Sequence, residues 1–92
     1  MQFEWNPKKA ESNFKKHNVE FSEAETIFGD PLAKIFDDDK HSTDENREII
    51  VGHSTENRLL IVSFTEREND TIRIISARIT TSQERKDFEN AK

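Results

Sequence analysis

Two arginines lie inside the most apolar segment of the chain, the run TIRIISARITTSQER at residues 71–85. The isoleucines of this run predict a buried strand, which is an unusual place for a guanidinium group. A guanidinium held on a rigid strand can grip a phosphate through two parallel hydrogen bonds. It can equally reach the edge of the sheet or pair with a carboxylate such as Glu66. Both interpretations of Arg73 and Arg78 stand at this point.

The spacing of these two arginines predicts the directions of their side chains. Side chains alternate between the two faces of a regular strand, so Arg73 and Arg78 are expected to point to opposite faces. A β-bulge near Ser76 and Ala77 would bring both to one face, because an extra residue reverses the alternation. The sequence leaves both arrangements open.

Other candidate groups precede this strand. Asp37, Asp39 and His41 alternate in the segment DDDKHS, but the glycine and the distant glutamate of an EF-hand loop are missing, so we expect no metal. His41 can act as an acid or a base near neutral pH. Glu66 stands beside Arg67, and the two can form a base with a phosphate clamp or merely a surface ion pair.

The composition describes one small, acidic domain spanning 1–92. The absence of cysteine excludes disulfides, and two glycines are too few for a glycine-rich phosphate loop. With 32% hydrophobic and 36% charged residues, we expect a thin core. A net charge of −5 argues against broad nucleic-acid binding, although residues 58–86 carry six basic side chains against four acidic ones. No apolar span suggests a membrane segment, and we expect a cytoplasmic protein.

Capping signals predict three helices. An Asn-Pro start predicts a first helix at 7–18, which ends at an asparagine that tolerates the left-handed conformation. A second helix at 22–28 is predicted from a capping box of Ser22 with the glutamate three residues later. The same kind of box, a threonine followed by a glutamate, predicts a C-terminal helix at 81–88.

Strand patterns occupy the rest of the chain, after a short extended piece at 3–5. Four strands are predicted, at 33–36, 48–53, 58–66 and 71–79. The run LLIVSF is apolar on both faces and marks a central strand. Short connections imply an antiparallel sheet with helices on one face, and the fold class is α+β.

Several ordered motifs run through almost the whole chain. They are FEWNPKKAESNFKKHNVEF at 3–21, DPLA at 30–33, TER at 65–67, and IRIISAR at 72–78 followed by ERKDFE. In this combination the chain resembles, over about residues 3–89, the BrnT family of toxins from type II toxin–antitoxin modules. The resemblance implies a RelE-like fold, in which two N-terminal helices and a C-terminal helix pack on a mainly antiparallel four-stranded sheet.

The resemblance also implies an activity, a metal-independent ribonuclease that arrests translation without a cofactor. In such a reaction the ribose 2′-hydroxyl attacks the neighbouring phosphate, which needs a base, an acid and positive charge on the phosphate oxygens. Arg73 and Arg78 would bind the phosphate, and His41 or Glu66 would supply acid–base chemistry. Three further arginines are expected to bind RNA, Arg58, Arg67 and Arg85.

The implied partner is a BrnA-like ribbon-helix-helix antitoxin. Operator DNA would be reached only through this antitoxin, which carries the DNA-binding surface. An alternative stays open, in which the chain is a catalytically weak or inactive toxin-like module that binds its antitoxin and tunes repression. The thin core, the net charge of −5, and Ser82 and Gln83 at positions where the family is commonly basic all favour that alternative.

Overall fold

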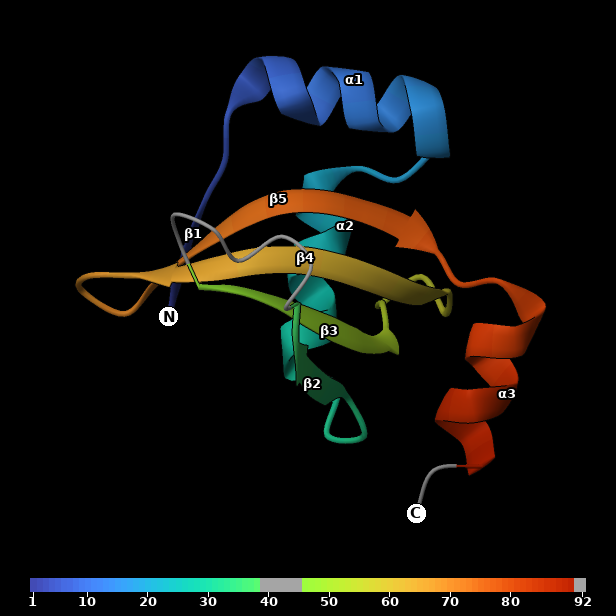
Figure 1. Ribbon diagram of the computed structural model, residues 1–92. Coiled ribbons are helices and arrows are strands. Elements are labelled where there is room, and N and C mark those ends of the chain that lie inside the picture. The colour runs from blue at the N-terminus through green and yellow to red at the C-terminus, as the bar shows by residue number, and fades with distance from the viewer. Residues whose placement is uncertain (39–45, 91–92) are drawn as a thin grey trace.

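The computed structural model describes residues 1–38 and 46–90, where a five-stranded sheet carries helices on one face and another helix at one end (Figure 1). The elements in chain order are β1 (Gln2–Glu4), α1 (Pro7–His17), α2 (Phe21–Ala24), the 3-10 helix η1 (Glu25–Gly29), β2 (Lys34–Asp37), β3 (Arg47–His53), β4 (Leu59–Arg67), β5 (Thr71–Ile79) and α3 (Ser82–Asn90). None of the helices in these ranges is long and apolar enough to cross a membrane.

The sheet is mixed and has the strand order β1-β5-β4-β3-β2. β5, β4, β3 and β2 are antiparallel neighbours, as predicted, whereas β1 pairs with β5 in parallel. The expectation of four strands was therefore wrong by one. The short piece at the N-terminus was recognised as extended, but three residues are too few to show the alternation that identifies a sheet strand.

The first helix agrees with its capping signals. The Asn6 side chain accepts hydrogen bonds from the backbone N–H groups of Lys8 and Lys9, at 2.9 and 3.2 Å. Asn18 ends α1 in the left-handed conformation, with φ of 58°, and its N–H donates to the Phe14 carbonyl.

The second helix differs from its prediction. A single α-helical turn begins at Phe21 and continues as a 3-10 helix. Ser22 lies inside the turn, where its hydroxyl donates to Glu20 at 3.3 Å, so it caps nothing. The apolar residues buried here are Phe21, Ala24 and Ile27, and their spacing of three matches the three residues per turn of a 3-10 helix.

The core lies between the helices α1, α2 and η1 and the face of the sheet that they cover. Its sheet side comes from β3, β4 and β5 and includes Leu60, Val62 and Phe64, which are at most 1% exposed. Aromatic edge contacts extend it, with Phe28 packed between Phe3 and Phe64 at centroid distances of 5.2 and 5.1 Å.

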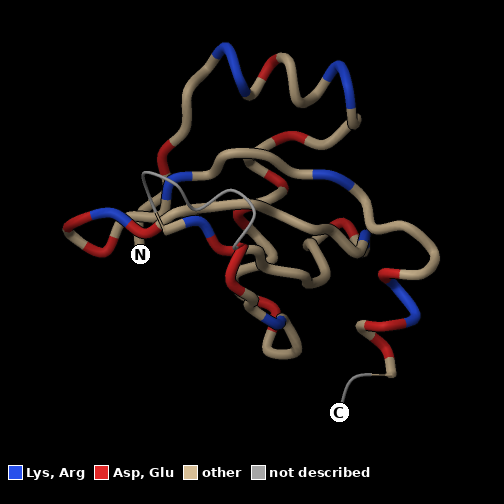
Figure 2. The backbone as a smooth tube through the Cα atoms, viewed as in Figure 1, with Lys and Arg blue, Asp and Glu red and all other residues tan. Residues whose placement is uncertain are grey.

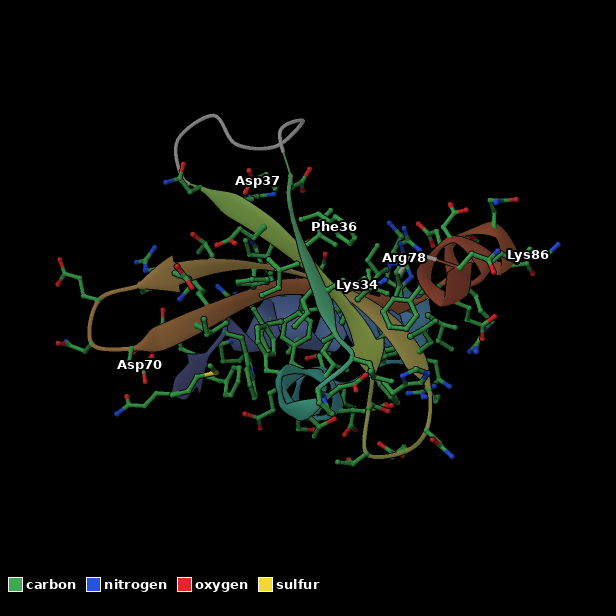
Figure 3. All side chains as sticks on the ribbon, turned by 90° about the horizontal axis from the view of Figure 1, so that it is seen from below. Lys34, Phe36, Asp37, Asp70, Arg78 and Lys86 are labelled. Atoms are coloured by element: carbon green, nitrogen blue, oxygen red, sulfur yellow. The ribbon has the colours of Figure 1, made fainter. Side chains whose placement is uncertain are left out.

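The C-terminal helix does not join this layer. α3 contains no buried residue and lies at the end of the sheet, on the side away from α1 and α2 (Figures 1 and 3). Its predicted capping box is present, because Thr81 N–H donates to Glu84 at 2.8 Å and Glu84 N–H donates to the Thr81 hydroxyl at 3.1 Å. The expectation that all helices cover one face of the sheet was therefore wrong. A capping signal shows where a helix begins, but it does not show which surface the helix packs against.

Candidate functional site

A β-bulge in β5 decides which way the strand arginines point. Phe64 of β4 pairs with Ile74, but its neighbour Ser63 pairs with Ser76, which leaves Ile75 as an extra residue. Such a residue reverses the alternation of side chains beyond it. The bulge at Ile75 lies one residue before Ser76 and Ala77, where the sequence analysis considered one.

Both strand arginines consequently lie on the same face of the sheet. Ile72, Ile74 and Ala77 point into the core and are at most 5% exposed, so Arg73 and Arg78 point away from it. We call the side of the sheet opposite α1, α2 and η1 the open face. Figure 3 shows Arg78 there, next to α3.

Other basic side chains join them on the open face. The strand pairing places Arg47 opposite Thr65 and Arg67 opposite Thr71, on the same side as Arg73, and Lys34 of β2 lies opposite Val51. Figure 2 shows basic residues near both ends of β5 and on neighbouring strands. The open face thus gathers cations from four strands of an otherwise acidic chain.

A hollow of about 350 Å³ lies between two of these arginines. We call it the polar hollow. Arg47, Arg78, Asp38, Ser63 and Ser76 line it, and Ile49 and Ile61 form its floor. Two guanidinium groups and two hydroxyl groups provide donors for a bound oxyanion, and the Asp38 carboxylate lines the same space.

Arg78 is held by a carboxylate from α3. Its two terminal nitrogens donate to the two oxygens of Glu84 at 2.7 and 2.9 Å. The hydrogen bond from Arg78 is the main reason that the pKa of Glu84 falls to about 2, and the same contact raises the pKa of Arg78. The side chains are 40% and 32% exposed, so a ligand can reach the guanidinium. The carboxylate therefore lies where a phosphate would bind.

Asn13 fixes the backbone beside Arg78. β1 pairs with β5 only as far as Arg73, so among the described residues the later part of this edge has no strand beside it. The buried amide of Asn13 replaces one, because it donates to the Ala77 carbonyl at 2.8 Å and accepts from the Ala77 N–H at 3.1 Å. It also donates to the Val19 carbonyl at 3.0 Å and so ties α1 to the strand.

Arg73 has a different carboxylate partner. It donates to Glu4 of β1 at 2.8 Å, and the two side chains are 35% and 42% exposed. It does not line the polar hollow. Arg73 and Arg78 thus share a face but occupy separate places on it.

Of the two predicted acid–base residues, Glu66 is described, and it does not join the arginines. Glu66 is paired with Ile72 and lies on the helix-covered side of the sheet, near Glu48. Burial, followed by the charges of Glu66 and Asp37, raises the pKa of Glu48. His41 lies outside the described residues, as does most of the segment DDDKHS. Within the described ranges, no three histidine or acidic groups come together in a way that could hold a metal ion.

Arg58 lies on the helix-covered side, away from the open face. Its Nε donates to Glu23 at 2.9 Å, and its Nη2 donates to the other Glu23 oxygen and to the Asn18 carbonyl. The hydrogen bond from Arg58 is the largest cause that lowers the pKa of Glu23, whose side chain is only 4% exposed. The hollow beside Arg58 also contains Glu20 and Glu56, so its surroundings repel a phosphate.

The two remaining predicted RNA contacts lie at opposite ends of the molecule. Arg67 ends β4, beside the turn to β5, and belongs to the open face. Arg85 lies on α3, is 45% exposed and pairs with Glu89 at 3.6 Å.

Sequence reasoning missed several members of the polar hollow. Arg47 was given no role in the sequence analysis, although its alternation with Ile49 and Val51 on β3 is a usable signal. Ser63 was not singled out, and Ser76 was named only as the place of a possible bulge, although both are small polar residues in apolar strands. Glu84 was assigned only to the helix cap, and no local pattern connects it with Arg78.

The fold and this site define a class of protein, a small α+β protein with a mixed sheet, helices on one face and arginines across the other. The family model described as the ribonuclease toxin BrnT of type II toxin–antitoxin systems matches residues 5–84. The chain belongs to this family.

The comparison with solved structures agrees with the family match. A crystal structure of the ribonuclease toxin BrnT from Brucella abortus is similar, with a TM-score of 0.68 and 23% sequence identity. The similarity covers 89% of this chain and 99% of the other, and it shows a shared fold. No curated protein matches the chain in sequence.

Proposed function

We propose that this chain is the toxin of a type II toxin–antitoxin pair and cleaves RNA without a metal ion. The observation that carries the proposal is the polar hollow, in which Arg47 and Arg78 flank one space on the open face of a chain from a ribonuclease toxin family. An RNA phosphate bound between them would meet positive charge held on rigid strands, once Glu84 has released Arg78.

The proposed reaction is an internal transfer at phosphorus. The 2′-oxygen forms a bond to phosphorus, and the bond from phosphorus to the 5′-oxygen breaks. The 2′-hydroxyl proton passes to a base, and the leaving oxygen takes a proton from an acid. The products are a 2′,3′-cyclic phosphate and a 5′-hydroxyl.

The proposed roles in this reaction differ from residue to residue. Arg78, joined by Arg47, binds the phosphate and stabilises its charge in the transition state. Arg73 and Arg67 extend the cationic surface along the strand. Glu66 lies on the other face of the sheet. His41, which lies outside the described residues, stays a proposed acid–base group.

Phosphate binding at Arg78 requires an exchange of partners. Glu84 already fills the two donor positions of the guanidinium that a phosphate would use. Since both side chains are partly exposed, the exchange costs less than breaking a buried pair.

The chemistry can be tested with purified protein and a short single-stranded RNA in the presence of EDTA. We expect fragments that end in 2′,3′-cyclic phosphate, identified by mass spectrometry. The same strand with one deoxynucleotide at the cleaved position should stay intact there, because it lacks the attacking hydroxyl. Cleavage that depends on added metal, or that proceeds at the deoxynucleotide, would contradict the proposed reaction.

The partner follows from membership in a family of type II toxins. We propose a BrnA-like ribbon-helix-helix antitoxin, which neutralises this chain and reaches operator DNA through its own surface. Coexpression should yield a complex whose operator binding is lost when the antitoxin is removed. Operator binding by this chain alone would contradict that division of labour.

A second candidate function is the catalytically weak, antitoxin-binding module. Both strand arginines are already engaged by carboxylates, Arg73 by Glu4 and Arg78 by Glu84, and this observation favours it. Induced expression separates the two functions, because a nuclease arrests growth and a binding module does not.

A further inference from the structure

A second hollow adjoins the polar hollow on the open face. We call it the apolar hollow, and it has a volume of about 390 Å³. Its lining consists mostly of apolar side chains, Phe36, Phe88, Ile49, Val51 and Ile61. Ile49 and Ile61 also line the polar hollow, so the two hollows are neighbours on the sheet.

The two phenylalanines come from elements that are far apart in the sequence. Phe36 lies on the edge strand β2 and is 52% exposed. Phe88 lies on α3. The Lys34 ammonium lies 5.5 Å from the centroid of its ring, and the centroid of the His53 ring lies 5.7 Å from the same point. Phe88 is the only apolar side chain within α3 (Ser82–Asn90), a helix with no buried residue, and its ring lines the hollow.

We propose that the apolar hollow binds an unpaired nucleobase next to the phosphate held at Arg78. This inference rests on the proposed function and specifies how the substrate is bound. A nucleotide joins a flat, largely apolar base to a phosphate, and the paired hollows offer apolar and cationic spaces in that same arrangement. Aromatic rings stack on bases whatever the sequence, since every base has a π-face.

The charges around the apolar hollow support a nucleotide over an apolar protein segment. Lys34 lines this hollow together with Glu84, whose carboxylate is paired with Arg78. Arg78 and Arg47 line the adjoining polar hollow. Asp87, whose carboxylate accepts from Gln83 at 2.9 Å, adds an acceptor for the edge of a base. Single-strand binding sites combine basic grooves and aromatic platforms in this way.

Binding of an uncleavable strand tests the base site apart from catalysis. The probes are a labelled single-stranded RNA of mixed sequence with 2′-O-methyl groups, and an abasic strand with the same number of phosphates. By fluorescence anisotropy, we expect the wild-type chain to bind the RNA about tenfold more tightly than the abasic strand. The Phe36→Ala and Phe88→Ala variants should lose most of this preference and keep their affinity for the abasic strand.

Two further variants separate stacking from folding. Phe88→Leu keeps an apolar side chain to hold α3 but removes the π-face, and it should also lose the preference. Phe14→Ala removes a 43% exposed phenylalanine from α1, on the other side of the sheet, and should behave as wild type. Circular dichroism would verify that each variant is folded.

The outcomes discriminate between the two proposals. A preference for bases that disappears in the phenylalanine variants supports the base site, even if unmodified RNA is not cleaved and the ribonuclease assignment fails. Equal binding of both strands by wild type, or a preference that survives in the variants, overturns the base site, even if RNA is cleaved. Loss of antitoxin affinity in these variants with unchanged RNA binding also overturns it and assigns the hollow to the protein partner.

Discussion

The pairs Arg58–Glu23 and Arg78–Glu84 are both two-pronged contacts, and they lie on opposite sides of one sheet. Glu23 is 4% exposed and also accepts a hydrogen bond from the Ser54 hydroxyl at 2.7 Å. Glu84 is 32% exposed, and its arginine opens onto the polar hollow. The first pair joins α2 to the loop between β3 and β4 and is part of the framework. The second can exchange its carboxylate for a ligand.

This difference shows that contact geometry alone does not reveal what an arginine does. A buried carboxylate that loses its partner is left without water or counter-charge, so such a pair is costly to break. A half-exposed pair contributes little to stability, because water can replace either partner. The surroundings of each arginine therefore decide between a structural and a functional role.

The largest effect on stability is expected from Arg58→Ala. Removal of this guanidinium leaves the Glu23 carboxylate buried and unpaired, which should lower the free energy of unfolding by about 3 kcal/mol. In a domain of this size the melting temperature should fall by more than about 10 °C. Arg85→Ala is the matched control, since it breaks only an exposed pair at 3.6 Å. Similar melting temperatures for the two variants in calorimetry would refute the framework role of Arg58.

The next effect concerns activity and is expected from Arg78→Ala. Loss of a preorganised donor to the phosphate should lower the rate of RNA cleavage by about 100-fold. Stability should change by less than about 1 kcal/mol, because the freed Glu84 is well hydrated. Single-turnover cleavage assays, with thermal melts run beside them, provide the measurement. If a folded variant cleaves RNA at the wild-type rate, Arg78 is not part of the active site.

The smallest effect is expected from Glu84→Gln. Glutamine still fits the capping box, but it releases the charge held on Arg78, so RNA should bind more tightly. Stability should fall by only about 0.5–1 kcal/mol near neutral pH. Anisotropy titrations and thermal melts would measure the two changes. Weaker RNA binding in the variant would show that Glu84 assists the substrate and does not compete with it.

The pH dependence of this variant sharpens the comparison. The pKa of Glu84 is lowered from 4.5 to about 2 in the folded chain, mainly by its hydrogen bonds with Arg78. A depressed pKa contributes stability that is complete above pH 4.5 and is lost as the pH falls towards 2. The difference in melting temperature between wild type and Glu84→Gln should therefore shrink across that range. A difference that stays constant down to pH 2 would mean that the charge of Glu84 contributes nothing.

Local sequence signals determined much of this fold, since they depend on neighbours in the chain. Asn6 and Asn18 marked the ends of α1, and the box of Thr81 with Glu84 marked the start of α3. The four antiparallel strands followed from alternation and from short connections. The ordered motifs also placed the chain in its family, which the family model confirms.

The tertiary structure alone decided how the site is assembled. The bulge at Ile75 reverses the side of Arg78, because alternation can be counted from the sequence only when every residue of a strand is paired. The partner of each arginine also depends on packing, which brings Glu23 to Arg58 from 35 residues away in the chain. Both arginines are visible in the sequence, but only the depth of burial around each distinguishes a framework contact from a place for phosphate.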